Sequence, residues 1–422
     1  MTLLGASLNS GAPITGNPPA VSVSMPVSSR EESRKVRYII MAGGGTGGHI
    51  YPGLAVVERL EQQTATLEPP VKIVWAATPR KIDQRLLGAA GADYIPQVIR
   101  PWSGNPLRWL EFYVAWRDTC RYWRAFFAEH DVAAVLALGG YAAGAVAYEA
   151  SRRNIPVALL NPDALAGRAN RFLMRHSNII YTQWPLGGNV VEQFADRTEV
   201  IGCPIRQALV RMNRAEAARR LGLDADRKTL VITGASLGAQ TINQAVTILL
   251  RDAEVQRLLH GPSDAGWQIL HLAGLDHAAE LRAVAARLEH IHWKILDYCD
   301  DMAAVWSMAD LAITRAGAGT CAELACMGVP AILMPYPFHK DRHQEANAAN
   351  LCNAGAAVLV RDTKDAGSNA AAIKEVISRL LSEPDRLGEM ALAAQSLAKP
   401  HAAMVVAQWL LQQLHLPTGV QT

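Results

Sequence analysis

The chain has 422 residues, of which half are apolar and 19% are charged. This composition supports sizeable buried cores and excludes a chain that is disordered as a whole, and the length predicts two or three domains. The 41 basic and 38 acidic residues nearly balance, so net charge gives no reason to expect a nucleic-acid partner. No apolar run reaches the roughly 18 residues that a membrane-spanning helix needs. The six cysteines form no Cys-x-x-Cys pair and no zinc-type spacing with histidine.

The first half of the chain alternates apolar runs with helical patterns. Residues 1–34 are rich in Ser, Pro, Gly and Asn, and we expect a disordered leader there. Apolar residues at helical spacing follow the first predicted strand. The strands predicted in this half are buried runs at 36–42, 71–76, 132–138 and 156–160. Such alternation is typical of βαβ units on a parallel sheet, so residues 35–205 are predicted to form one Rossmann-like domain.

The second half repeats this pattern. Strands are predicted at 228–233, 267–272, 311–314 and 331–334, within a second Rossmann-like domain at 227–399. The polar residues around 206–226 are predicted to form a linker or a connecting helix. The fold class is therefore α/β, with two parallel sheets. Ligands of such folds bind at the carboxyl ends of the strands, so we expect one cleft between the domains.

Three glycine-rich turns follow predicted strands, at 43–48, 139–144 and 234–238. Glycines there allow backbone N–H groups to approach an anion at a helix N-terminus, although tight turns also need glycine for structural reasons. The first turn fits the dinucleotide pattern G-x-G-x-x-G, but the next strand ends at Ala77-Thr78 without the acidic residue that an NAD or FAD site needs. The three turns together predict anionic ligands on both sides of the cleft.

Two further segments carry candidate chemistry. His49 follows the first turn; a lone histidine is more often structural, but a neutral imidazole there could take a proton from an attacking hydroxyl. Thr320 and Glu323 have the spacing of a capping box, and a carboxylate in a first helical turn could also accept two ribose hydroxyls. The polar run 335–347 is either a solvated loop or the lip of the site.

These motifs together resemble the MurG family, the glycosyltransferases that form lipid II in peptidoglycan synthesis. The resemblance covers about 36–415, and its carriers are the segments 44–55, 139–141, 202–206, 234–239 with Asn243, 300–302, 315–323 and 343–348. It implies a GT-B fold, in which the two Rossmann-like domains face each other across the cleft and a helix at about 400–416 packs back on the first domain. It also implies inverting transfer of N-acetylglucosamine from UDP-GlcNAc to undecaprenyl-pyrophosphoryl-MurNAc-pentapeptide.

The resemblance assigns the second domain to the donor. Ser236 and the turn at Gly238 would contact the pyrophosphate, and Glu323 would bind the ribose. Arg206 would reach the nucleotide from the hinge between the domains. The other residues implied for the donor are Cys299 at the uracil, Ala318, Gly319 and Thr320 at the phosphates, and His343, Gln344 and Asn347 at the sugar. Across the cleft, Thr46, Gly47, Gly48 and His49 would lie near the reacting hydroxyl, and Gly45, Gly139, Gly140 and Tyr141 near the acceptor pyrophosphate.

Two segments depart from the family pattern, and both lie in the acceptor half. The family's His-Glu-Gln-Asn run is replaced by residues 160–163, so Asp163 stands at the position of a site asparagine, and the turn at 140–145 lacks the family's serine and proline. The catalytic base is predicted to be His49, with Asp163 as a second candidate or as the group that orients His49. Another GT-B glycolipid transferase with a UDP-hexose donor is the alternative, and a UDP-sugar binder or epimerase without transfer remains a further one.

Residues 100–127 combine aromatic side chains with arginines. They fit either a core helix or a helix lying in an anionic membrane interface. The predicted contact point is Leu107, Arg108, Trp109 and Leu110. The resemblance implies a peripheral enzyme on the cytoplasmic face of the plasma membrane, with possible partners among the wall-synthesis proteins. No bound metal is expected to be required, and a divalent cation would at most stimulate.

Overall fold

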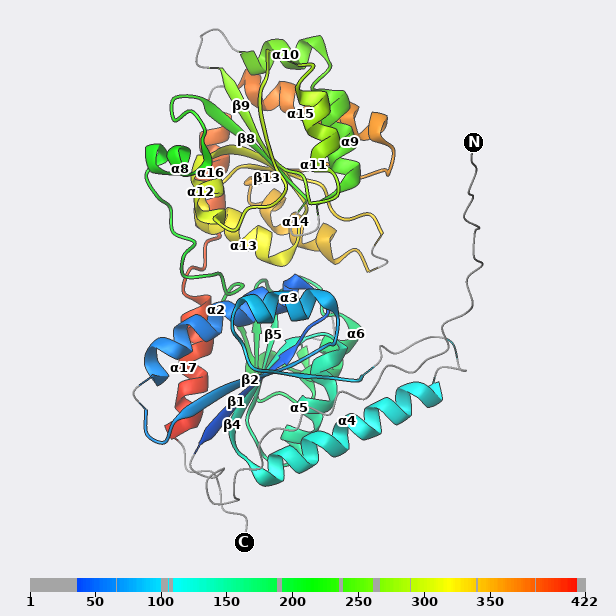
Figure 1. Cartoon of the computed structure of the whole chain (residues 1–422), viewed down its shortest axis with the longest axis vertical. Coiled ribbons are helices and arrows are strands. Elements are labelled where there is room, and N and C mark those ends of the chain that lie inside the picture. The colour runs from blue at the N-terminus through cyan, green and yellow to red at the C-terminus, as the bar shows by residue number, and fades with distance from the viewer. Residues whose placement is uncertain are drawn as a thin grey trace, which may run out of the picture.

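The computed structural model describes residues 36–65, 67–99, 105, 109–187, 192–234, 238–260, 266–288, 290–338, 341–383 and 385–415. These residues form two α/β units, which lie one above the other in Figure 1. The expected leader at 1–34 lies outside the described residues.

The first unit is built on a seven-stranded sheet with the strand order β3-β2-β1-β4-β5-β6-β7. Every neighbouring pair in this sheet is parallel. The strands are β1 (Arg37–Gly43), β2 (Val71–Ala77), β3 (Tyr94–Pro96), β4 (Asp131–Gly139), β5 (Val157–Asn161), β6 (Ile179–Thr182) and β7 (Thr198–Val200). The helices are α2 (Gly47–Thr64), α3 (Lys81–Ala89), α4 (Trp109–Glu129), α5 (Gly144–Ser151) and α6 (Arg168–Met174), with short 3-10 turns at Tyr141–Ala143 and Ala195–Arg197.

The second unit has a six-stranded parallel sheet in the order β10-β9-β8-β11-β12-β13. Its strands are β8 (Lys228–Thr233), β9 (Trp267–Leu272), β10 (His292–Leu296), β11 (Ala309–Thr314), β12 (Ala331–Leu333) and β13 (Ala357–Leu359). The helices of the second half are α8 (Arg214–Leu221), α9 (Gln240–Leu249), α10 (Ala253–His260), α11 (Ala278–Ala285), α12 (Met302–Met308), α13 (Ala318–Met327), α14 (His343–Asn353), α15 (Ala366–Ser382), α16 (Arg386–Ser396) and α17 (Ala402–His415). The predicted α/β class with two parallel sheets is confirmed.

The eight strands predicted from apolar runs are all present. The central strands are buried on both faces; the four residues from Ile39 to Ala42 of β1, for example, have no exposed surface. Helices cover both faces of a parallel sheet, so its central strands carry continuous apolar runs rather than alternating ones. The strands without such a run, β3, β6, β7, β10 and β13, were not predicted. Four of them have no more than four residues, and β10 lies at the edge of its sheet.

The segment predicted to be a linker or connecting helix contains α8. This helix packs against α12, and its apolar residues Ala217, Ala218 and Leu221 lie in the core of the second unit. The Arg214 guanidinium donates to the carbonyl oxygens of Ala225, Arg227 and Met308 and to Asp310 Oδ2, which is 2.9 Å from Nη2. Most of this segment is therefore part of the second unit, because it buries an apolar face there.

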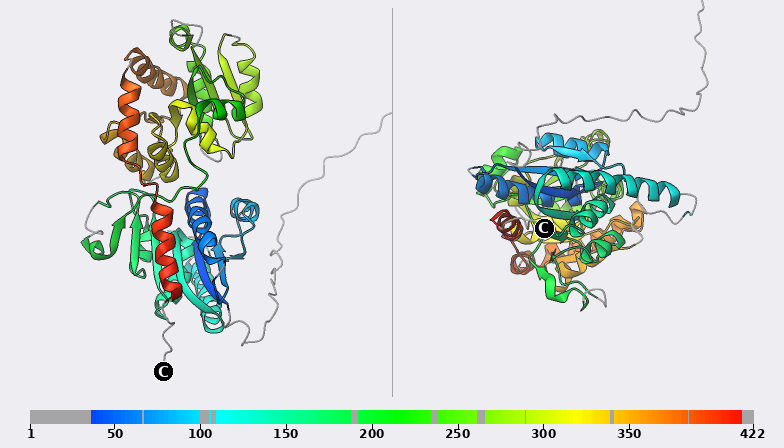
Figure 2. Two further views of the ribbon diagram at one scale, coloured as in Figure 1. Left: turned by 90° about the vertical axis from the view of Figure 1, so that its left-hand side faces the viewer. Right: turned by 90° about the horizontal axis from the view of Figure 1, so that it is seen from below.

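The last helix returns to the first unit. α17 contacts α2 and β4, and the left view of Figure 2 shows it, in red, beside the blue helix near the start of the chain. Val406, Ala407 and Leu410 have no exposed surface and pack with Ile39 and Leu60. The core of the first unit is therefore made from both ends of the described chain.

We expect Leu410→Ala to lower the free energy of unfolding by about 2–5 kcal/mol, because it leaves a cavity in a closed core. Leu392→Ala on α16 is the matched control, since Leu392 is 70% exposed and its loss should change stability by about 0.5 kcal/mol or less. Urea unfolding of both variants measures the difference. Equal effects would show that α17 does not stabilise the first unit.

Candidate functional site

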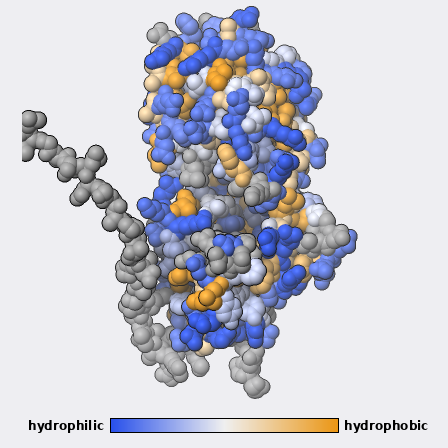
Figure 3. Space-filling model, turned by 90° about the vertical axis from the view of Figure 1, so that its right-hand side faces the viewer, coloured by the Kyte–Doolittle hydropathy of each residue, from blue (hydrophilic) through white to orange (hydrophobic). Residues whose placement is uncertain are grey.

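Two helix N-termini lie at the boundary between the units. α2 begins after the turn that follows β1, and α13 begins after the turn that follows β11, so both helices start at the carboxyl edge of a sheet. α13 contacts α2, and Figure 1 shows α13 and α14 directly above α2 and α3. On the face drawn in Figure 3, a hollow separates the upper and lower halves at this level. The N-terminus of a helix attracts anions through its free N–H groups and its dipole.

The first glycine turn encloses a buried carboxylate that the sequence analysis missed. Asp83 has no exposed surface, and its two oxygens accept the Gly45 N–H at 2.9 and 2.8 Å. The Thr78 N–H and hydroxyl donate to Asp83 Oδ2 at 3.0 and 2.5 Å. A Cβ at Gly44 would lie only 2.4 Å from the same oxygen. Gly45, expected at the acceptor pyrophosphate, therefore has its N–H bonded to Asp83, and Gly44 makes room for that carboxylate.

A cation beside this turn was also not anticipated. The exposed Arg80 places Nη1 3.3 Å from the Gly45 carbonyl oxygen. Its guanidinium carbon lies 6.0 Å from the centre of the Tyr141 ring. Arg80 therefore adds a positive charge between two residues that were expected near the acceptor pyrophosphate.

The His49 side chain is oriented by a backbone carbonyl group. Its Nδ1 lies 3.0 Å from the Gly44 carbonyl oxygen and 3.5 Å from Thr46 Oγ1. With the Nδ1 proton donated to Gly44, Nε2 is the unprotonated nitrogen. A Cβ at Gly139 would lie 3.3 Å from the imidazole Cδ2, and one at Gly140 would lie 3.0 Å from its Cε1. Both glycines have left-handed φ angles, +98° and +76°, so they supply the turn and the space against which the ring packs.

A chain of amides leads from this turn toward Asp163. The Gly140 N–H donates to Asn170 Oδ1 at 3.3 Å, and Asn170 Nδ2 donates to Asn161 Oδ1 at 2.7 Å. Asn161 Nδ2 in turn donates to the Asp163 carbonyl oxygen at 2.7 Å. The partner of the His49 imidazole is the Gly44 carbonyl oxygen, and Asp163 Oδ1 bonds elsewhere. The role of Asp163 as a base or as the group that orients His49 stays a prediction.

That other partner is Asn347, which joins the two units. Asn347 has no exposed surface. Its Oδ1 accepts the Ala164 N–H at 2.8 Å, and its Nδ2 donates to Asp163 Oδ1 at 2.9 Å and to the Ala316 carbonyl oxygen at 3.1 Å. Asn347 was expected to hold the donor sugar. In this arrangement its amide is instead bonded to both domains, next to the start of α13.

Glu323 lies one turn inside α13. The N-cap of this helix is Gly317, which makes no side-chain cap, so Thr320 is a helical residue and the predicted capping box is wrong. Glu323 Oε2 accepts instead from Trp306 Nε1 at 2.9 Å. Burial raises the pKa of the Glu323 carboxyl to about 7, and the hydrogen bond from Trp306 lowers it only in part. The carboxyl group is therefore close to its titration point at neutral pH.

The first turn of α13 remains suited to an anion. Ala318, Gly319 and Thr320 precede Cys321, whose N–H makes the first bond back to the Gly317 carbonyl oxygen. N–H groups in a first helical turn have no partner within the helix. A Cβ at Gly319 would meet nothing within 4 Å, so the backbone there can be approached closely.

Two further donor candidates lie near elements that contact α13: Cys299 just before α12, and Gln344 in the first turn of α14. Tyr298 precedes Cys299, and its hydroxyl lies 3.3 Å from that of Tyr51 on α2; burial and this contact raise the pKa of Tyr298. Burial also raises the pKa of the half-buried Cys299 thiol. Gln344 Oε1 accepts the Tyr336 N–H at 2.9 Å.

Two charged donor candidates have close ionic partners. His343 Nδ1 lies 2.7 Å from Asp341 Oδ1. Arg206 is ion-paired with Glu58 of α2, which also accepts the Gln207 N–H at 2.9 Å. The structure thus places Arg206 at the hinge, although paired within the first unit. Ser236 lies outside the described residues.

Helix α4 is buried in its second half and exposed at its N-terminal end. Its second half is core, with Trp123, Phe126 and Phe127 buried. At its N-terminal end, Trp109 is 47% and Leu110 71% exposed, and this end projects away from the body of the protein (Figure 1). Figure 3 views the molecule from that side and shows apolar residues, in orange, on the lower half. Leu107 and Arg108 lie outside the described residues.

Among the described residues, no group of three or more His, Cys, Asp and Glu side chains is arranged to hold a metal ion. The expectation that transfer requires no bound metal stays a prediction. In the same part of the chain, no helix combines the length and apolar character needed to cross a bilayer.

Comparison with known proteins shows which family and which solved structures this chain resembles. The model of the glycosyltransferase family 28 N-terminal domain matches residues 39–182, and that of the family 28 C-terminal domain matches residues 229–406. The crystal structure of Acinetobacter baumannii MurG has a TM-score of 0.64 at 27% identity, and the match covers 89% of this chain and 99% of that one. The UDP-GlcNAc 2-epimerase of Neisseria meningitidis, with a TM-score of 0.59 at 15% identity over 89% of this chain and 100% of its own, shares the fold alone.

Two curated relatives carry the same name, UDP-N-acetylglucosamine--N-acetylmuramyl-(pentapeptide) pyrophosphoryl-undecaprenol N-acetylglucosamine transferase. The protein of Alkalilimnicola ehrlichii is 37% identical over 383 residues, which are 89% of this chain and 98% of the relative. That of Leifsonia xyli is 35% identical over 364 residues, or 85% of this chain and 93% of the relative. Both halves of the chain and nearly the full length of these relatives are matched, and the chain therefore belongs to the MurG family of glycosyltransferases.

Proposed function

We propose that the protein transfers N-acetylglucosamine from UDP-N-acetylglucosamine to a polyprenyl-pyrophosphate-linked N-acetylmuramoyl pentapeptide, which yields lipid II. The observation that carries this proposal is the pairing of the two helix starts. The α13 start, with Glu323 behind it, belongs to the same boundary as the α2 start, with His49. A nucleotide diphosphate fits the first, and a nucleophilic hydroxyl beside a base fits the second.

The reaction would be a single displacement with inversion at the anomeric carbon. His49 Nε2 would take the proton of the acceptor hydroxyl as the new glycosidic bond forms and the bond to UDP breaks. The N–H groups at Ala318, Gly319 and Thr320 would stabilise the negative charge on the departing diphosphate. The donation of Nδ1–H to Gly44 holds the imidazole in the tautomer that this role needs. Arg80 would supply charge for the acceptor pyrophosphate.

Transfer of labelled sugar from UDP-N-acetylglucosamine to a lipid I analogue tests the proposal, with product identified by mass. The second candidate is a glycolipid transferase of the same fold with another UDP-hexose. It is favoured by the two departures from the family pattern, Asp163 at a position where the family has asparagine and the turn at 140–145 without the family's serine and proline. Parallel assays with UDP-glucose and UDP-galactose separate the two. No transfer from UDP-N-acetylglucosamine to the analogue would reject the first.

We propose that the enzyme is peripheral, on the cytoplasmic face of the plasma membrane, and that the N-terminal end of α4 docks on the bilayer. The support is the exposure of Trp109, Leu110 and Tyr113, which is 47%, 71% and 61%. Aromatic and aliphatic side chains at the end of a helix can insert at the level of the headgroups. A lipid-linked acceptor would need such a contact.

For the donor site, Glu323→Ala should weaken UDP binding by about 1.5–3 kcal/mol, because the ribose hydroxyls lose a charged acceptor. Titration calorimetry measures the affinity. The control is Leu392→Ala on the exposed face of α16, which should leave UDP affinity unchanged. If Glu323→Ala lowers the melting temperature and leaves UDP affinity unchanged, Glu323 is structural and does not contact the ribose.

The raised pKa adds a pH dependence. Burial shifts the pKa of Glu323 from 4.5 to about 7, so the carboxylate that accepts the hydroxyls forms only as the pH passes neutrality. UDP affinity of the wild type should therefore rise between about pH 6 and about pH 8. Glu323→Gln cannot ionise and should bind UDP more weakly with a flatter profile. A rise of equal size in both proteins would assign the titration to another group.

For the base, His49→Ala should lower the transfer rate by roughly 10²–10⁴ while UDP-N-acetylglucosamine still binds. Asp163→Asn is the matched comparison, because its amide oxygen can still accept from Asn347, and it should slow transfer only a few-fold. Single-turnover rates and donor affinities are measured together. A large loss in Asp163→Asn with little loss in His49→Ala would transfer the role of base to Asp163.

For the membrane contact, replacing Trp109 and Leu110 with serine should release the protein from vesicles that contain phosphatidylglycerol, because apolar area at the interface is lost. UDP affinity should be unchanged. Leu392→Ser, on the exposed face of α16, is the control for loss of an exposed apolar side chain. Vesicle sedimentation decides, and full retention of the double variant on the vesicles would place the docking surface elsewhere.

A further inference from the structure

A separate pocket lies in the second unit, beyond the carboxyl ends of β12 and β13. Its volume is about 260 Å³. One water molecule needs a cavity of only roughly 10–15 Å³, so the pocket has room for a larger ligand. The pocket is lined by Pro335, Tyr336, Pro337, Arg342, Glu345, Arg361, Asp362, Thr363 and Lys364. None of these residues is itself a donor or acceptor candidate, but the first five belong to the polar run 335–347, and the Tyr336 N–H donates to the donor candidate Gln344. The pocket therefore adjoins the residues expected at the donor sugar without including them.

The charge of this pocket is positive. Arg342, Arg361 and Lys364 are exposed cations at its walls. Arg361 makes no side-chain hydrogen bond or ion pair with any described residue, and Arg342 has only a loose contact with Glu345, 3.9 Å between Nη1 and Oε2. Three cations thus face one solvent-accessible carboxylate.

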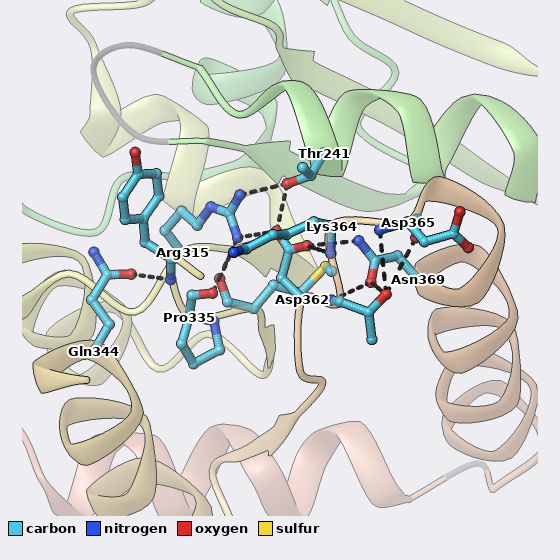
Figure 4. A network of polar contacts seen from close by, with 11 residues as sticks. Thr241, Arg315, Pro335, Gln344, Asp362, Lys364, Asp365 and Asn369 are labelled. Carbon is cyan, nitrogen blue, oxygen red and sulfur yellow. Dashed lines mark hydrogen bonds and ion pairs between the residues drawn. The ribbon is translucent and has the colours of Figure 1, made fainter. Parts of the chain in front are cut away.

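The second acidic residue of the lining does not offset these charges. The Asp362 side chain has no exposed surface and lies 2.8 Å from Arg315 Nη1. Asp362 also accepts from Thr241, from Asn369 Nδ2 at 2.8 Å and from the Lys364 N–H at 2.8 Å, as Figure 4 shows. Its carboxylate is therefore saturated by neighbours behind the pocket wall.

The same network makes the walls rigid. Arg315 Nη1 donates to the Met334 carbonyl oxygen at 3.0 Å and to that of Pro335 at 3.3 Å, and its Nη2 donates to Thr241 Oγ1 at 2.7 Å. The buried guanidinium, drawn at the centre of Figure 4, thus ties the ends of β12 and β13 to α9. A ligand entering the pocket meets groups that are already ordered, which lowers the entropy cost of binding.

Two of the cationic residues have an uncommon backbone conformation. Arg342 has a φ angle of 49° and Lys364 one of 68°, in the left-handed region that residues other than glycine seldom adopt. Such conformations concentrate at ligand sites. The Lys364 ammonium also lies 4.6 Å from the centre of the Phe338 ring. These side chains are held at the pocket at a cost in stability that a bound anion would offset.

We propose that this pocket binds a phosphate group, separately from the UDP site. Two arginines and a lysine around one cavity provide the forked and point-like charged donors that phosphate oxygens accept. The group could come from a phospholipid headgroup or from a soluble phosphate. A headgroup is favoured, because Tyr336 and Phe338 are 40% and 57% exposed beside the cations.

The test uses the full chain with the UDP site saturated by UDP, and inorganic pyrophosphate as the soluble probe. Arg361→Gln with Lys364→Gln should weaken pyrophosphate binding by about tenfold or more, because two charge-assisted contacts are lost. Arg251→Gln with Arg287→Gln is the matched control, since it removes two exposed charges from the same unit. Arg361→Gln alone guards against misfolding, because this side chain makes no hydrogen bond or ion pair with the described part of the chain.

A second arm uses vesicles of phosphatidylcholine with and without phosphatidylglycerol. Weaker binding to the phosphatidylglycerol vesicles by the pocket variant but not by the control supports a headgroup ligand, and weaker pyrophosphate binding alone supports a soluble phosphate. If the pocket variant matches the control in both arms, the proposal is wrong. Transfer to a detergent-dispersed acceptor should be unchanged throughout, so loss of the pocket and failure of the proposed activity are distinguishable.

Discussion

One buried amide bonds to both domains. Asn347 bonds to Asp163 and Ala164 of the first domain and to Ala316 of its own. Opening the boundary would leave Asp163 and the Ala164 N–H without these bonds until water replaced them, and an unsatisfied buried polar group costs about 1–3 kcal/mol. Because Ala316 immediately precedes the turn that starts α13, the same contacts set the position of that helix start relative to the first domain.

The glycines of the acceptor half act by the space they leave as much as by the N–H groups they carry. A side chain at Gly44 would displace the Asp83 carboxylate, and one at Gly139 or Gly140 would meet the His49 ring. The buried Asp83 accepts the Gly45 N–H and thereby shapes the turn, while the Gly44 carbonyl orients the imidazole. The glycine-rich sequence pattern suggests phosphate binding. In the folded protein these glycines position the Asp83 carboxylate and the His49 ring.

Local sequence predicted the central strands and the helices that follow the glycine turns, because burial on both faces leaves a continuous apolar run. It did not predict Asp83 or the contacts of Asn347, since their partners lie 38 and 184 residues away. It also misjudged Thr320 and Glu323, whose spacing fits a cap. The helix begins two residues before Thr320 instead, and Glu323 pairs with Trp306 from α12. The motifs were enough to identify the family. The residues that contact those motifs in the folded protein lie far away in the sequence, so no local pattern predicts them.

The position of α17 has a consequence for how the protein folds while it is being translated. The sheet of the first domain is synthesised early, yet the helix that covers part of β1 and β4 is made last. Until residues 402–415 emerge, Ile39 and Leu60 lack the apolar side chains that pack on them in the finished protein. The domain whose synthesis begins first therefore completes its core last, after the second domain has been translated. During that interval its incomplete core exposes apolar surface to which a chaperone can bind.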